Sequence, residues 1–167
     1  MEGAVNNGNF SRDDMMLGGV AILLIIDLIA LPWFSIGGGS IGNVSFPSVS
    51  LTATDAPDGW LGVLALLAVI AVIVDLGIER LSPQTQVPAI GANRTMTRFV
   101  LAAAGAAFLA LKFLFHIGSF SSLGFGFWAA VVLTAGLVFV ALQARNAQPV
   151  RPTTPVGPAG PAGPPAV

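Results

Sequence analysis

The sequence predicts an all-α protein: a bundle of four transmembrane helices with a short extended or hairpin element in the first outer loop and a disordered C-terminal tail. Three observations predict this fold. Hydrophobic residues make up 54% of the 167 residues and charged residues only 9%, whereas soluble domains carry about 25% charged residues. Four apolar stretches approach the roughly 20 residues that cross a bilayer. The basic residues gather between alternate stretches, as in membrane proteins.

The four predicted spans are 15–34, 59–78, 97–117 and 124–143. Backbone groups find no water in hydrocarbon, so such segments form helices or barrel strands. These stretches are too long and too uniformly apolar for alternating barrel strands. The first is expected to be a retained helix, because its flank carries Glu2, Asp13 and Asp14 against Arg12, whereas a signal peptide has a basic n-region.

Basic residues determine the predicted orientation. The outer loops 35–58 and 118–123 contain no Lys or Arg. All basic residues but Lys112 lie in the N-terminal flank, around the inner loop 79–96, or in the tail. The positive-inside rule therefore predicts a multi-pass protein of the plasma membrane with both termini cytoplasmic. The tryptophans fall at the outer ends of spans, where interfacial anchors lie; they are Trp33, Trp60 and Trp128.

The chain is accordingly divided into a cytoplasmic flank 1–14, a transmembrane domain 15–143 and a Pro/Gly/Ala-rich cytoplasmic tail 144–167.

In the outer loop, VSFPSVSLTAT alternates apolar and small polar residues, which predicts an extended or hairpin segment lying over the helix ends. Pro47 would confine this segment to an edge strand. The loop is interpreted either as a simple connector or as a contact surface for a neighbouring protein. The tail, which contains GPAGPAGPP, is typical of a disordered segment leaning to polyproline II.

Asp27, Asp75 and Lys112 fall inside the predicted spans, where a charge costs roughly 2.5–3.5 kcal/mol and needs a partner. With a rise of about 1.5 Å per residue, Asp27 lies about 18 Å and Lys112 about 22 Å from the inner ends of their spans. We therefore expect an Asp27–Lys112 ion pair. Asp75 lies about 6 Å from the inner end of its span, level with Arg98, so Asp75–Arg98 is the second expected pair.

In the third span, Arg98, Gly105, Lys112 and His116 fall on one stripe at about 100° per residue. Such a stripe indicates a helix buried in a bundle. One interpretation is structural, with ion pairs selecting helix neighbours and His116 as an interfacial cap. The other is a proton or ion path with Asp27, Lys112 and His116 as relay groups.

Several function classes are disfavoured by what the sequence lacks. There is no cysteine and a single histidine, too few for a bis-histidine haem or a typical zinc site. No nucleotide-binding glycine motif occurs, and no Ser–His–Asp arrangement is suggested. The net charge of −1 gives no reason to expect a nucleic-acid partner. We expect neither an enzyme nor a bound cofactor.

Three stretches carry a family resemblance: LPWFSIGGGSIG, SLTATDAPDGWLGVLALLAVIAVIV and GFGFWAAVVLTAGLVFVALQ. They resemble uncharacterised small four-helix integral membrane proteins of high-GC Gram-positive, actinobacterial-type bacteria. In these a PW motif ends the first span, DGW enters the second and GxGxW enters the fourth. The resemblance covers most of 15–143 and brings no catalytic residues. The layout is also similar to the claudin plan, without the cysteine pair or the tryptophan motif of that family, and we treat this as an architectural analogy.

The function expected from the sequence is that of a non-enzymatic accessory or scaffold subunit of a membrane complex. It would sit in the lipid bilayer with a membrane-protein partner or as a homo-oligomer. The alternative is a small channel or proton-linked transporter that uses Asp27, Lys112 and His116.

Overall fold

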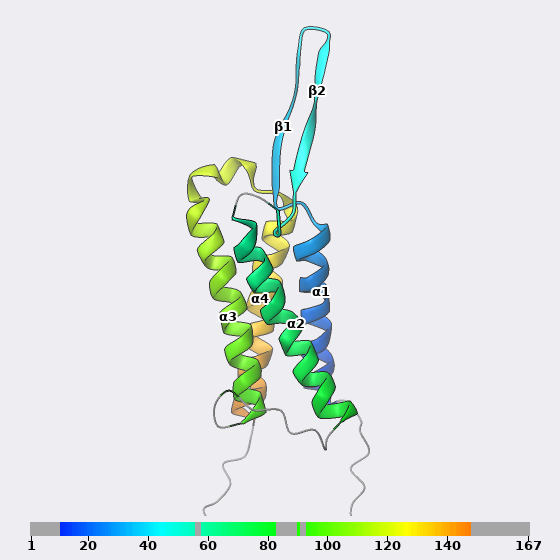
Figure 1. Cartoon of the computed structure of the whole chain (residues 1–167), viewed down its shortest axis with the longest axis vertical. Helices are drawn as coiled ribbons and strands as arrows, with labels where there is room; N and C mark the ends of the chain where they lie inside the picture. Colours follow the sequence, from blue (N-terminus) through cyan, green and yellow to red (C-terminus); the bar gives the residue numbers. More distant parts are fainter. Residues whose placement is uncertain (1–10, 56–57, 83–89, 91–92, 148–167) are drawn as a thin grey trace, which may run out of the picture.

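The computed structural model describes residues 11–55, 58–82, 90 and 93–147. Four helices lie side by side along one axis, and a β-hairpin rises from one end of them (Figure 1). Each helix packs mainly on two others, α1 on α2 and α4, and α3 on α2 and α4. The elements are α1 (Arg12–Ala30), β1 (Phe34–Ile41), β2 (Val44–Leu51), α2 (Gly59–Leu81), α3 (Arg94–Phe115), the 3₁₀ segment η1 (Ile117–Ser122) and α4 (Phe125–Asn146). The tail 148–167, predicted to be disordered, lies outside the described residues.

Three of these helices, α2, α3 and α4, are long and apolar enough to cross a membrane. The chain is therefore a multi-pass membrane protein by the length and composition of its helices. By the same measures α1 does not qualify, because its 19 residues include Arg12, Asp13, Asp14 and Asp27. Of the four spans expected from the sequence, three are thus supported by the length and composition of the helices.

Local sequence explains where α1 begins and ends. Ser11 and Asp14 form a capping box, in which each side chain accepts a hydrogen bond from the backbone N–H of the other at 3.1 Å, an arrangement that satisfies N–H groups left free at a helix start. The helix ends at Ala30, and Leu31 is extended because the residue before a proline is driven out of the helical region. The predicted span 15–34 was therefore too long at its outer end, where Phe34 already belongs to β1.

The outer loop forms a regular two-stranded antiparallel hairpin. Its turn is Gly42–Asn43, and Gly42 has φ +62°, a value that suits the first position of a tight hairpin turn. The expected hairpin is present, but its predicted placement over the helix ends was wrong: it stands away from the bundle, along the long axis (Figure 1). Gly38 and Pro47 are the one opposed pair missing from an otherwise continuous register, because proline has no N–H to donate.

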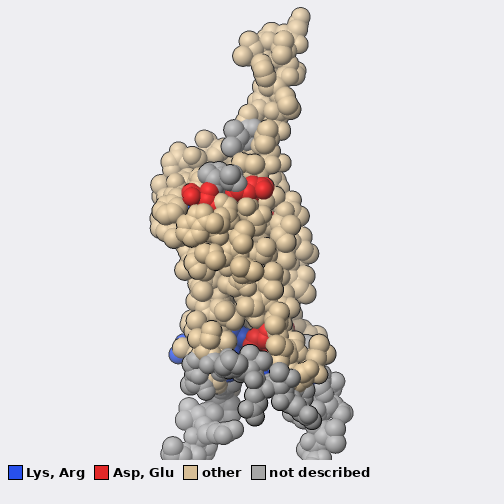
Figure 2. Space-filling model, in the orientation of Figure 1, with Lys and Arg blue, Asp and Glu red and all other residues tan. Residues whose placement is uncertain are grey.

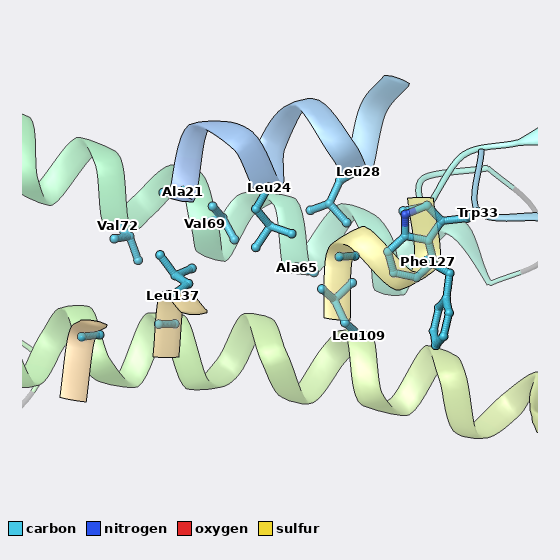
Figure 3. Packing of buried hydrophobic residues seen from close by; sticks show 14 of the residues in the cluster. Ala21, Leu24, Leu28, Trp33, Ala65, Val69, Val72, Leu109, Phe127 and Leu137 are labelled. Carbon is cyan, nitrogen blue, oxygen red and sulfur yellow. The ribbon is translucent and has the colours of Figure 1, made fainter. Parts of the chain in front are cut away.

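The core lies between the four helices. Figure 3 shows Leu24 and Leu28 of α1, Val69 of α2 and Leu137 of α4 converging there, and each is almost completely buried. The outside of the bundle is apolar as well. Large exposed apolar side chains occur on every helix and include Ile22, Ile26, Leu67, Val74, Leu114, Val132 and Phe139. An apolar exterior of this extent marks a surface that faces lipid or another protein.

Charged side chains leave a wide uncharged band. On the face shown in Figure 2 they appear at two levels only, one near the base of the hairpin and one at the opposite end of the bundle. The length of α2, 23 residues, corresponds to about 35 Å, enough for the roughly 30 Å hydrocarbon core of a bilayer. The band fits a membrane that the helices cross from one charged level to the other.

Glycines allow two loops to press against helix starts. A Cβ at Gly62 would overlap the carbonyl oxygen of Ala53, and one at Gly124 would overlap that of Pro32. Gly124 N–H donates to Trp33 O at 2.7 Å, and Gly126 N–H donates to Pro32 O at 3.0 Å. Gly124 and Gly126 of GxGxW, and Gly59 and Gly62 in the first turn of α2, are therefore required by close backbone approach rather than by loop flexibility.

Replacing Gly62 with alanine is expected to lower the free energy of unfolding by about 1–3 kcal/mol, because the new methyl group forces the 53–54 backbone away from α2. Gly77 in the same helix is the matched control, since its added Cβ would meet nothing within 4 Å. Gly77→Ala should instead raise stability by up to about 1 kcal/mol. Equilibrium unfolding in detergent micelles measures both, and equal effects at the two positions would contradict the packing described.

Candidate functional site

Lys112, near the end of α3, is completely enclosed, with 1% of its surface exposed. Its ammonium donates hydrogen bonds to backbone carbonyl oxygens of the loop before α2, at 2.6 Å to Ala53, 3.3 Å to Asp58 and 3.4 Å to Asp55. The ring of Phe34 lies 5.9 Å from the same nitrogen. An ammonium group has three donors and no acceptor, so a group of converging carbonyls suits it. We call this arrangement the lysine cradle: Lys112 and the carbonyls of Ala53, Asp55 and Asp58.

The loop is folded so that these carbonyls point inward. The Asp55 carboxylate accepts hydrogen bonds from the N–H and the hydroxyl of Thr52, at 2.8 and 2.9 Å. The pKa of Asp55 is lowered by these two hydrogen bonds and by the charge of Lys112, so the carboxyl is ionised at neutral pH. Asp58 adopts a left-handed conformation with φ +53°. The sequence analysis missed these carbonyl ligands because every residue has a carbonyl and no residue type marks them.

Asp27 does not meet Lys112, and the predicted Asp27–Lys112 ion pair was wrong. Its carboxylate, in the interior at 1% exposure, accepts a hydrogen bond from Trp33 Nε1 at 3.3 Å. Its other oxygen has no hydrogen-bond partner among the described residues. The two residues were paired because they lie at similar depths in their spans, but depth does not show that the carbonyls of Ala53, Asp55 and Asp58 bind the lysine.

Trp33 was also predicted wrongly as an interfacial anchor. Only 1% of its surface is exposed, and its ring meets Phe127 edge to face, with 5.7 Å between centroids. The turn at Pro32 and the backbone bonds to Gly124 and Gly126 direct the indole into the bundle. Trp60 and Trp128 are about half exposed, as interfacial anchors would be.

His116 acts as the C-terminal cap of α3. Its Nδ1 lies 2.9 Å from the carbonyl oxygen of Lys112, and because a carbonyl only accepts, Nδ1 carries the proton. Its Nε2 is 3.9 Å from an Asp58 carboxylate oxygen, and its ring lies 5.1 Å from that of Phe34. His116 thus adjoins the lysine cradle, while Asp27 bonds to Trp33, so the contacts among the described residues do not join Asp27, Lys112 and His116 into a relay.

At the other end of the bundle, Arg98 of α3 forms the centre of an ion network. Its Nε lies 2.7 Å from Asp75 Oδ2, so the expected Asp75–Arg98 pair is present. Arg98 also pairs with Glu79, and its Nη1 lies 3.6 Å from Asp14 Oδ1. Asp14 pairs in turn with Arg80. The network therefore ties α1, α2 and α3 together at one level.

Sequence reasoning found the α2–α3 half of this network and missed the contribution of α1. Asp14 is 7% exposed and Arg98 is 5% exposed. The same estimate of depth that paired Asp75 with Arg98 would have placed Asp14 at their level, because it begins the first helix at its inner end. The signal was present, but Asp14 was assigned to the cytoplasmic flank 1–14 and not to the first span.

A cavity of about 710 Å³ opens between α3 and α4. It is lined almost wholly by apolar side chains, among them Ala110, Phe113, Phe127 and Val131, and by none of the charged residues described above. Within the described ranges, no group of three or more His, Asp or Glu residues is placed to hold a metal ion. The buried charges therefore meet protein groups and do not line this cavity.

No family model, curated protein or solved structure matches this chain. In the cradle the ammonium of Lys112 meets backbone carbonyls, and in the ion network the charged groups meet opposite charges. The two arrangements lie at the two ends of an apolar bundle. Such arrangements fix loops and helices in place.

Proposed function

We propose that the chain is a four-span plasma-membrane protein, with both termini cytoplasmic, that acts as a non-enzymatic accessory or scaffold subunit. The observation that carries this proposal is the hairpin of β1 and β2. It extends beyond the bundle (Figure 1), and its apolar side chains Ile41, Val44 and Phe46 are 52–77% exposed. An exposed apolar surface on a projecting hairpin favours binding of another protein.

The proposed fourth span is α1. Its 19 residues correspond to about 28 Å, close to the hydrocarbon thickness. Asp14 and Asp27 are buried within the protein, while the outward side is apolar. That side consists of Met15, Met16, Ile22, Leu23, Ile26 and Ile29. A helix that buries Asp14 and Asp27 and exposes such residues along its length suits a bilayer better than water.

The orientation follows from the positive-inside rule. Arg80, Arg94 and Arg98 belong to one end of the bundle, at the ends of α2 and α3 remote from the hairpin. The hairpin end carries Asp55 and Asp58, and its single basic residue in the described segments is the enclosed Lys112. The hairpin is thus proposed to lie outside the cell.

The alternative of a small channel or proton-linked transporter draws less support. It needs Asp27, Lys112 and His116 to exchange protons or ions along a connected path. Lys112 contacts loop carbonyls, and the described partner of Asp27 is Trp33. Because Lys112 bonds to backbone carbonyls and Asp27 bonds to an indole N–H, both groups favour a structural role.

The test is to replace 35–50 with a short Gly/Ser linker, retaining Phe34 and Leu51 at the base of the hairpin. Membranes are extracted in mild detergent, and polypeptides that co-purify stoichiometrically with the tagged chain are quantified by mass spectrometry. A differently tagged copy of the chain counts as one of them. We expect the intact chain to retain a stoichiometric partner and the hairpin-less variant to lose it, because the exposed apolar surface is gone.

Two controls accompany this experiment. Val132→Ala trims an exposed apolar side chain on α4, far from the hairpin, and should leave the partner bound. The hairpin-less variant should unfold at a temperature close to that of the intact chain, because none of the core residues lies within 35–50. Recovery of the same partner by a well-folded hairpin-less variant would refute the scaffold proposal.

A further inference from the structure

The hairpin has edges that nothing in the described structure covers. Phe34, at its base, bridges Leu123, and above this point the two strands pair only with each other. Unpaired strand edges are templates for strand addition. A single two-stranded hairpin is also marginally stable in water. Both properties favour a hairpin that is completed by another strand.

The hairpin also lacks the charges that usually block edge pairing. The segment 34–51 contains no Asp, Glu, Lys or Arg, although lysines and inward-pointing charges are the common protection of exposed edges. It carries no charge that would repel an identical hairpin. Pro47 interrupts one point of the ladder without adding charge.

Opposed residues in the hairpin match by kind. Ile41 faces Val44, Ser40 faces Ser45, and Ser35 faces Ser50. Gly39 faces Phe46, which leaves room for the large ring. At these levels the residue on one strand therefore suits the residue opposite it on the other strand.

Identical chains in one membrane hold their hairpins at the same height and in the same direction. β1 runs away from the bundle and β2 runs back, so β1 of one copy and β2 of its neighbour are antiparallel. At equal height these two strands meet in the register of the hairpin itself, with Ser40 opposite Ser45 of the neighbour and Ile41 opposite Val44. We propose that the hairpin binds a second copy of this chain by pairing β1 with the neighbour's β2.

This inference rests on the proposed function, in which the helices span the membrane and the hairpin is a contact surface. It names the partner of that surface. Pairing of β1 with β2 is heterologous, because different edges meet, and each added copy offers a new free edge. The copies therefore associate side by side in the membrane plane and close into a ring where the rotation between neighbours permits.

The chain has no cysteine, so single cysteines report pairing without background. One copy carries Ser40→Cys with one tag, and another carries Ser45→Cys with a second tag. Because Ser40 and Ser45 face each other within a hairpin, dividing them between copies ensures that a disulfide reports a contact between chains. The two purified proteins are mixed, reconstituted into phosphatidylcholine–phosphatidylglycerol vesicles with no other protein, and oxidised with copper phenanthroline.

We expect the mixed disulfide joining the two tags to be the main cross-linked product, because opposed β residues lie close enough for a disulfide. Ser40→Cys paired with Ser50→Cys is the matched control. Its cysteines lie on the same two strands but five levels apart, about 16 Å along the strand, and should give no mixed product. Equal yields from both pairs, self-pairs of Ser40→Cys as the main product, or no cross-link would overturn the inference.

The outcomes separate this inference from the proposed function. Absence of the Ser40–Ser45 cross-link, together with loss of a stoichiometric partner on hairpin removal, would refute pairing between copies and leave the scaffold function standing. Retention of partners after hairpin removal would refute the scaffold function itself. Before oxidation, each cysteine variant is checked by thermal unfolding, so that a missing cross-link shows that the hairpins do not pair and not that the variant is misfolded.

Discussion

Replacing Arg98 with methionine is expected to lower the free energy of unfolding by about 3–5 kcal/mol, the cost of removing one member of a buried ion network. The Arg98 side chain is 6% exposed and is the point at which α1, α2 and α3 meet. Without it, Asp75 and Asp14 remain largely buried, and the carboxylates of Asp75, Asp14 and Glu79 repel one another without the cation between them. Arg80 compensates for Asp14 alone.

Arg12→Met is the matched control for this substitution. It removes the same charge from the same end of the bundle, but Arg12 is exposed and forms none of the ion pairs found in the described residues. Surface charges of this kind contribute about 0–1 kcal/mol. Equilibrium unfolding in detergent micelles compares the two variants. A cost for Arg98→Met no larger than that for Arg12→Met would show that the network does not hold the helices together.

Asp75→Asn in the Arg98→Met background gives a second check on the same network. Removing a carboxylate that has lost its cation should restore part of the stability, whereas Asp75→Asn alone should reduce it. Residues in one ion network show coupling energies of about 0.5–3 kcal/mol. Purely additive effects would contradict the direct Asp75–Arg98 contact.

Lys112→Met is expected to lower the free energy of unfolding by about 2–4 kcal/mol, because a buried charged donor with several carbonyl acceptors is lost. The carbonyls of Ala53 and Asp58 would then lack their ammonium partner, and the loop before α2 should loosen. Protease cleavage or hydrogen exchange within 52–55 measures the loosening directly. An unchanged loop together with unchanged stability would contradict the lysine cradle.

The same variant tests the relation between Lys112 and Asp27. If the two formed an ion pair, Asp27→Leu would rescue Lys112→Met, because replacing both charges of a buried pair is often neutral. In the structure they have different partners, Trp33 for Asp27 and the loop carbonyls for Lys112. We therefore expect the two effects to add within about 0.5 kcal/mol. Rescue in the double variant would instead support the Asp27–Lys112 ion pair that was predicted from depth.

The lysine cradle and the tryptophan show why contacts were harder to predict than spans. Lys112, Asp27 and Trp33 were all identified in the sequence as residues that need partners or an interface, and all three do have specific surroundings. Their partners were predicted wrongly. Lys112 meets the carbonyls of Ala53, Asp55 and Asp58, and the segment at Trp33 is held by backbone bonds to Gly124 and Gly126. Both sets of partners lie far away in the chain and reach these residues only through folding. The Asp75–Arg98 pair was predicted correctly because both residues lie on neighbouring helices at one level.

The sequence by itself determined the apolar helices and their approximate limits, the concentration of charge at the ends of the bundle, and the presence of a hairpin in the outer loop. These follow from local properties: hydropathy, the helical period, proline and glycine. Only the tertiary structure decided that Trp33 points inward, that Lys112 binds backbone carbonyls, that Asp14 joins Arg98, and that the hairpin stands clear of the bundle. Each of these depends on which distant segments meet at one height, and neither local pattern nor depth alone contains that information.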